Sequence, residues 1–163
     1  MKQLPVVVKI FALLMVLMLS TTQTRAEVYI RQTIILTPQE QEALIRFIQQ
    51  NDSAHQLWLD IRQQADSVLA DAPDPQERIH YEGLLDTNSK RIQTEQALED
   101  MDKLAQLLFA YYGSGDTKYV EKTKQFIMAW VRAYKATGNP INENKFEPLI
   151  HCYYVMKSAF TVA

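Results

Sequence analysis

The sequence predicts an all-α fold made of antiparallel helical hairpins, and three observations lead to this prediction. Glycine is scarce, with four residues in the whole chain. Long alternations of β-branched residues are absent after Ile35. Apolar residues instead recur at helical spacing nearly everywhere beyond Thr37, a pattern that gathers them on one face of a helix. Residues 27–163 are therefore expected to form one helical domain of ordinary length.

Residues 1–26 have the pattern of a cleaved secretory signal peptide. Lys2 and Lys9 flank or enter an apolar run that ends at Leu19, and Thr24-Arg25-Ala26 supplies small residues at the positions that a signal peptidase recognises. The uninterrupted apolar segment, residues 10–19, is much shorter than the roughly 20 residues that cross a bilayer. We therefore expect cleavage near Ala26 and a periplasmic or secreted protein without a stable membrane anchor.

The first two predicted helices are defined by their ends. Thr37-Pro38-Gln39-Glu40 combines a capping box with proline at the first helical position. A second helix is expected from about Ser53 to Ala70, and the prolines of Asp71-Ala72-Pro73-Asp74-Pro75 end it. The apolar side chains expected to be buried are Leu44, Phe47 and Ile48 in the first helix, and Leu57, Trp58, Ile61, Ala65, Val68 and Leu69 in the second.

Three further helices follow at about Ser89–Tyr112, Thr117–Ala136 and from about Asn144 onward. Gly113-Ser114-Gly115-Asp116 is a short connection, so the helices on either side of it are expected to pack antiparallel. Glu99 and Lys103 have the i,i+4 spacing of a helical ion pair. The expected apolar faces are Ala97, Met101, Leu104, Leu108 and Tyr111; then Tyr119, Thr123, Phe126, Ile127, Trp130 and Tyr134; then Phe146, Leu149, Ile150, Tyr153 and Phe160.

Charge is distributed unevenly along the chain. Without residues 1–26 the chain has 14 basic and 19 acidic side chains and a net charge of −5, yet residues 117–163 have 7 basic and 3 acidic side chains. A basic surface there would raise the local concentration of an anionic polymer. A solvated helical face is the commoner explanation of such a charge pattern.

Several kinds of site are disfavoured by the residues themselves. Cys152 is the only cysteine, which excludes an intrachain disulfide, and its apolar neighbours predict a buried thiol. No histidine and carboxylate cluster has metal-ligand spacing, so neither a metal nor another cofactor is predicted. Gly113-Ser114-Gly115 lacks the Lys-Ser/Thr of a phosphate-binding loop. Nothing in this acidic chain resembles a nucleic-acid-binding module.

A family resemblance covers roughly residues 79–160. The motifs that carry it are Tyr81-Glu82-Gly83-Leu84-Leu85, Lys90-Arg91, Leu98-Glu99-Asp100-Met101, Tyr111-Tyr112-Gly113-Ser114-Gly115-Asp116-Thr117-Lys118-Tyr119 and Thr137-Gly138-Asn139-Pro140-Ile141-Asn142-Glu143-Asn144-Lys145. They resemble the N-terminal part of the bacterial alginate lyase family. The resemblance implies a partial (α/α) toroid and a polysaccharide lyase that cleaves alginate or a related polyuronate, such as glucuronan, by β-elimination.

The resemblance also implies where the catalytic groups belong. In the family, an Asn-His pair on one helix and a later Arg and Tyr neutralise the uronate carboxylate and transfer the protons, because negative charge builds up there as the bond breaks. This sequence contains no Asn-His dipeptide, and we expect those residues beyond Ala163. The catalytic residues are therefore unknown, and the chain alone is expected to be inactive. An incomplete toroid would expose an apolar edge that a partner could cover.

The candidate substrate-binding residues are Lys90, Arg91, Asn142 and Lys145. Lys90 and Arg91 lie at a predicted helix entrance, where cations and backbone N–H groups suit a uronate carboxylate; a solvated charged turn is the alternative. Asn142, Glu143 and Lys145 belong either to sugar contacts or to a capping network in which Asn144 starts the fifth helix, and capping is favoured. For the whole chain, the alternative function is a non-catalytic periplasmic helical protein that binds oligouronates or another protein.

Aromatic residues and histidines present the same choice between a functional and a packing role. Trp130 and the pairs Tyr111-Tyr112 and Tyr153-Tyr154 offer rings that stack on sugars, but aromatics at helical spacing are more often core residues. His80 and Tyr81 form an adjacent acid and base pair in sequence, with no third group to orient them. Surface or packing roles are therefore favoured for both residues.

Overall fold

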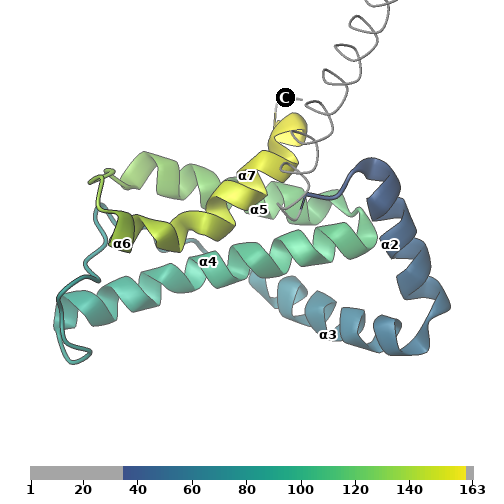
Figure 1. The fold of residues 1–163 in the computed structure, drawn as a ribbon, viewed down its shortest axis with the longest axis horizontal. Helices are drawn as coiled ribbons and strands as arrows, with labels where there is room; N and C mark the ends of the chain where they lie inside the picture. Colours follow the sequence, from purple (N-terminus) through teal and green to yellow (C-terminus); the bar gives the residue numbers. More distant parts are fainter. Residues whose placement is uncertain (1–34, 161–163) are drawn as a thin grey trace, which may run out of the picture. The chain divides into compact units, whose positions relative to one another are not determined.

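The all-α prediction is confirmed by the computed structural model, which describes residues 35–160. Helices account for the regular structure of this range, and it contains no strand (Figure 1). No helix among these residues is both long and apolar enough to cross a membrane. The predicted signal peptide lies outside the described residues.

Helices α2 (Pro38–Gln50) and α3 (Asp52–Val68) begin with side-chain caps. Thr37 Oγ1 accepts from Glu40 N at 3.2 Å, and the Thr37 N–H donates to Glu40 Oε2 at 2.9 Å, so the predicted capping box is confirmed. Asn51 Oδ1 accepts from Ala54 N at 2.9 Å and starts α3. Each cap satisfies a backbone N–H that has no partner inside the helix.

Helices α4 (Ser89–Ser114) and α5 (Thr117–Ala133) are separated by two residues. Gly115 lies between them with φ of 71°, a left-handed conformation that glycine adopts without a Cβ penalty. Asp116 caps α5 through a hydrogen bond from Lys118 N to Asp116 Oδ1 at 3.0 Å. The predicted turn is therefore shorter than expected, because Gly113 and Ser114 belong to α4.

The last part of the chain contains α6 (Pro140–Glu143), the 3₁₀ helix η1 (Asn144–Phe146) and α7 (Glu147–Phe160). The fifth predicted helix therefore begins later than Asn144. Helix α4 lies in the middle of this part of the structure and contacts α2, α3, α5 and α7 (Figure 1). The core forms around α4, and most of the predicted core positions of α4 and α5 belong to it, among them Ala97, Met101, Leu104, Leu108, Tyr119, Phe126, Ile127 and Trp130.

Several predicted packing residues are exposed instead. Leu57 on α3 is 64% exposed and Phe47 on α2 is 56% exposed. On α7, Ile150 is 60% exposed and Tyr153 is 51% exposed. These corrections have one physical reason: α2, α3 and α7 each pack against α4 with one flank, and the helical apolar stripe is wider than the covered flank.

Glu99 and Lys103 form no direct ion pair within the described residues, and Glu99 is only one of several charges that raise the pKa of Lys103. Lys103 Nζ lies 3.2 Å from Asp71 Oδ2 and 3.7 Å from Asp100 Oδ1. Asp71 belongs to the segment after α3, which crosses α4 at this point. The lysine therefore connects this segment to α4, which satisfies its charge better than an exposed neighbour on the same helix.

Candidate functional site

The segment between α3 and α4 returns along α4 and brings His80 and Tyr81 over its first turns. The buried Thr94 on α4 accepts a hydrogen bond from His80 N at 3.0 Å. Ile79 is buried in the core beside it. Asn88 Oδ1 accepts from Lys90 N at 3.0 Å and caps α4. The chain around Tyr81 is thus fixed from the α4 side.

A second segment, distant in sequence, fixes Tyr81 from the other side. Asn142 on α6 is only 9% exposed, and its Oδ1 accepts from Tyr81 N at 3.2 Å and from Glu82 N at 3.0 Å. Asn139 Nδ2 donates to Glu82 Oε2 at 2.5 Å. The Asn142 side chain therefore accepts hydrogen bonds from the backbone of a loop 60 residues earlier in the chain.

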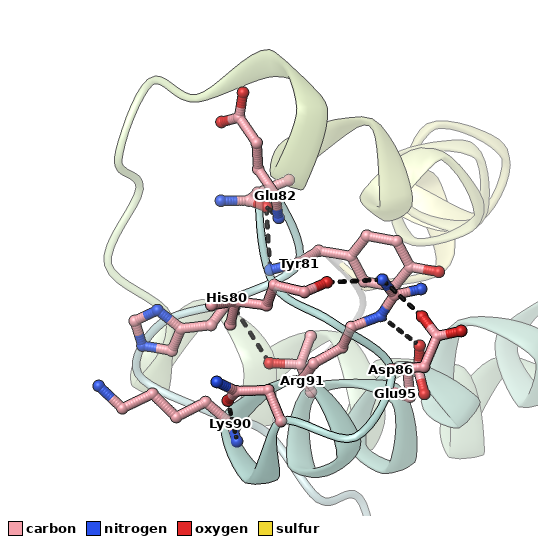
Figure 2. A network of polar contacts seen from close by, with 11 residues as sticks. His80, Tyr81, Glu82, Asp86, Lys90, Arg91 and Glu95 are labelled. Carbon is pink, nitrogen blue, oxygen red and sulfur yellow. Dashed lines mark hydrogen bonds and ion pairs between the residues drawn. The ribbon is translucent and has the colours of Figure 1, made fainter.

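Arg91 is fully engaged within the site. Its Nε donates to Glu95 Oε1 at 2.9 Å, and its Nη1 lies 2.8 Å both from Leu84 O and from Asp86 Oδ1 (Figure 2). The guanidinium also lies 4.6 Å from the centre of the Tyr81 ring. The hydrogen bond to Glu95 is the largest cause that raises the pKa of Arg91. This arginine shapes the loop around Tyr81, and its charge is already paired.

Lys145 and Lys90 are the open cations of the site. Lys145 Nζ lies 4.8 Å from the centre of the Tyr81 ring, a second cation–π contact to the same side chain. Neither lysine has an ion pair with a carboxylate within residues 35–160. Figure 2 shows Lys90 and His80 on one side of the loop and the Arg91 guanidinium on the other. The structure thus gathers Arg91, Asn142 and Lys145 around Tyr81 and leaves Lys90 apart.

A cavity of about 270 Å³ opens beside Tyr81 and Lys145. The other lining residues are Glu95, Leu98, Glu99, Met101 and Asp102 of α4 and Pro148 of α7. Carboxylates accept hydrogen bonds from hydroxyl groups, whereas a lysine donates to a carboxylate. This combination suits a hydroxyl-rich ligand whose acidic group lies at Lys145 and not among the three carboxylates.

Glu143 presents the same choice between sugar contacts and a capping network as Asn142 and Lys145, although it is not among the four candidate substrate-binding residues. Its Oε1 accepts from Thr137 N at 2.5 Å, Gly138 N at 3.0 Å, Thr137 Oγ1 at 3.1 Å and the Tyr134 hydroxyl at 3.0 Å. These donors, the Thr137 N–H first, lower the pKa of Glu143. Burial, followed by the Glu143 hydrogen bond, raises the pKa of Tyr134. Glu143 therefore belongs to a hydrogen-bond network around the turn before α6, the alternative that capping predicts.

The remaining candidates have structural surroundings. Trp130 and Tyr112 are buried in the core, as favoured, whereas Tyr153 and Tyr154 are each about half exposed. The side chains of His80 and Tyr81 extend away from each other in Figure 2, an arrangement that does not support an acid and base pair. The predicted buried thiol is confirmed, because Cys152 is fully buried, donates to Leu104 O at 3.3 Å and has a pKa raised to about 12 by burial.

Comparisons with known proteins leave the assignment to the chemistry of the site. No protein-family model matches this chain, and no curated protein and no solved structure matches it at a significant level. No group of three or more His, Cys, Asp or Glu residues within the described range has the geometry to hold a metal ion.

Proposed function

We propose that this protein binds an acidic polysaccharide, alginate or a related polyuronate such as glucuronan, as the helical part of a polysaccharide lyase that acts by β-elimination. The observation that carries the proposal is spatial. Two parts of the chain that resemble alginate lyases, residues 81–91 with the motifs 81–85 and 90–91, and residues 137–145, lie far apart in sequence and meet around Tyr81. Chance similarity in unconnected segments would give no reason for the segments to form one site.

The two lysines near Tyr81 support an acidic sugar polymer as the ligand, whereas the three carboxylates of the cavity would face its hydroxyl groups. Lys145 lines the cavity and is available to a uronate carboxylate there, whereas Lys90, on the other side of the loop, would meet a carboxylate of another sugar unit of the polymer. Glu95, Glu99 and Asp102 offer acceptors to the sugar hydroxyls. The basic residues 117–163 extend the positive potential along the chain. A long polymer would therefore contact more than the cavity.

The proposal includes the partial (α/α) toroid. A further helical layer, or a partner, would cover the apolar side chains that α5 and α7 expose, including Val131, Ile150 and Tyr153. The exposed apolar edge supports this arrangement, because large apolar patches usually mark an interface. A structure of the protein from its native source in which this face is open to solvent would contradict the toroid.

Binding and cleavage are tested together on protein from its native source. Titration calorimetry with alginate and with glucuronan oligosaccharides measures affinity, and ultraviolet absorbance of the unsaturated uronate measures β-elimination. We expect binding of at least one polyuronate, weakened by added salt because the contacts are ionic. The same oligosaccharide with its carboxyl groups reduced should not bind.

Single variants of basic residues locate the binding site. Lys145→Ala should weaken polyuronate affinity about tenfold, the effect of losing one charge-assisted contact of roughly 1.4 kcal/mol. Arg46→Ala, which removes an exposed cation on α2 outside the site and outside the basic residues 117–163, is the control and should leave affinity within about twofold. Absence of binding to both polymers would refute the proposal. Binding without the unsaturated product would favour the non-catalytic oligouronate-binding protein.

A further inference from the structure

We propose that Glu143 is a positioning residue, whose carboxylate orders the turn that holds Tyr81 and Lys145 in the binding site. The inference rests on the proposed polyuronate-binding function. It concerns a residue that lies outside the cavity beside Tyr81 and contacts none of the open cations of the site. Its effect on a ligand would therefore pass through the backbone.

Four hydrogen-bond donors converge on one atom of Glu143. Glu143 Oε1 accepts from two successive backbone N–H groups, those of Thr137 and Gly138, and from the hydroxyls of Thr137 and Tyr134. Gly138 has φ of 73°, so the backbone is in a left-handed conformation at this point. The carboxylate thus fixes both the start of the turn and the tyrosine at the end of α5.

Hydrogen bonds of Asn139 connect this turn to α6. Asn139 N donates to Thr137 Oγ1 at 3.3 Å, and Asn139 Oδ1 accepts from Ile141 N at 2.9 Å and from Asn142 N at 3.2 Å. The position of Thr137 therefore determines the position of the residue that caps α6. The Glu143 N–H donates a hydrogen bond to Asn139 O at 2.9 Å, and this bond closes the turn.

Helix α6 is bonded in turn to the loop of the binding site. The Asn139 side chain fixes the position of Asn142. Asn142 Oδ1 accepts hydrogen bonds from the backbone N–H groups of Tyr81 and Glu82. Asn139 also donates to the Glu82 side chain. Lys145 follows two residues after Glu143 and lies on the Tyr81 ring. Without the carboxylate, four donors lose their shared acceptor, and the connection to Tyr81 loosens with them.

The test compares Glu143→Ala and Glu143→Gln with the wild type. Amide hydrogen exchange measured by NMR reports on the backbone of residues 81, 82, 137 and 138, and calorimetry with an alginate or glucuronan oligosaccharide measures affinity. The Gln side chain retains an acceptor oxygen at the same reach, so it should partly rescue what Ala loses. Glu147→Ala is the matched control, since Glu147 is an exposed carboxylate four residues away.

The expected result is faster exchange at Tyr81 and Glu82 in Glu143→Ala and about tenfold weaker binding. Glu143→Gln should be intermediate, and Glu147→Ala should match the wild type. Faster exchange at Thr137 and Gly138 alone would show a purely local role and overturn the inference. If the wild type binds no polyuronate, the proposed function fails, while exchange at Tyr81 and Glu82 still decides whether Glu143 positions this loop.

Discussion

Asp100 shows at the scale of one residue how a buried carboxylate stabilises this fold. It is 1% exposed on α4, and its Oδ2 accepts from Asp74 N at 2.8 Å and from Trp130 Nε1 at 2.9 Å. One carboxylate therefore joins α4, α5 and the segment after α3. Burial raises the pKa of Asp100 above its ordinary value of 3.8, although both hydrogen bonds and the Lys103 charge act in the opposite direction.

Removing the Asp100 acceptor should destabilise the protein strongly. Asp100→Ala leaves the Trp130 Nε1–H and the Asp74 N–H buried without a partner, which should cost about 2–4 kcal/mol of unfolding free energy. Asp102→Ala on the exposed side of α4 is the control and should stay within about 0.5 kcal/mol. Urea denaturation followed by circular dichroism measures both values. Equal stability of the two variants would contradict the role assigned to Asp100.

The raised pKa of Asp100 predicts the pH dependence of the Asp100→Asn variant. A carboxyl group whose pKa is higher in the folded state destabilises the fold once it ionises, so wild-type stability is lost as pH rises from 3.8 through the raised pKa. Asparagine does not titrate. Stability of the wild type relative to Asp100→Asn should therefore increase as pH falls from 7 toward about 4. A difference that is constant in a denaturation series across this range would contradict the prediction.

The candidate site could be predicted only in part, because the sequence shows the charge and local position of each residue but not its partners elsewhere in the chain. Charge and loop position indicated Arg91 and Lys145, and both do lie at Tyr81. The partners of Asn142 are 60 and 61 residues earlier in the chain, so no local pattern indicates them. Arg91 likewise looked available because its ion pair with Asp86 depends on how the intervening loop folds.

At the scale of elements, Gly113 explains why α3 and α4 approach so closely. A Cβ at this position would collide with the Trp58 indole and would lie 3.2 Å from Ile48 Cδ1. Helical periodicity located both helices, but Gly-Ser-Gly-Asp is typical of a turn, and the sequence alone assigned Gly113 to it. Close packing of Trp58 requires a glycine at this position. Local helix and turn propensities do not indicate a contact between residues so distant in sequence.

Gly113→Ala should therefore destabilise the protein, although alanine in an open helical position gains about 1 kcal/mol over glycine. Forcing the methyl group against Trp58 should cost about 1–3 kcal/mol of unfolding free energy. In a Trp58→Leu background the same substitution should cost less, because the indole is absent. Thermal denaturation of the four proteins gives the coupling energy. A stabilising effect of Gly113→Ala in the wild type would exclude the close contact.

At the scale of the whole molecule, the structure consists of helices packed around α4, with α2 and α3 on one side and α5 and α7 on the other (Figure 1). Asp66 near the end of α3 connects these sides directly. Its Oδ1 lies 2.9 Å from Lys118 Nζ and accepts from the Tyr119 hydroxyl at 2.8 Å, both at the start of α5. The Lys118 hydrogen bond is the largest cause that lowers the pKa of Asp66.

Asp66→Asn should show a pH dependence opposite to that of Asp100→Asn. Because the folded state lowers the pKa of Asp66, its contribution to stability is present above 3.8 and is lost as pH falls through the folded pKa. The side chain is 37% exposed, so solvent screens the ion pair, and the loss at pH 7 should be about 0.5–1.5 kcal/mol. Wild type and variant should converge in acid, as measured by urea denaturation from pH 7 to pH 3. Asp60→Asn, on the exposed face of the same helix, is the control. If Asp60→Asn lost as much unfolding free energy at pH 7 as Asp66→Asn, Asp66 would not join the two sides of α4.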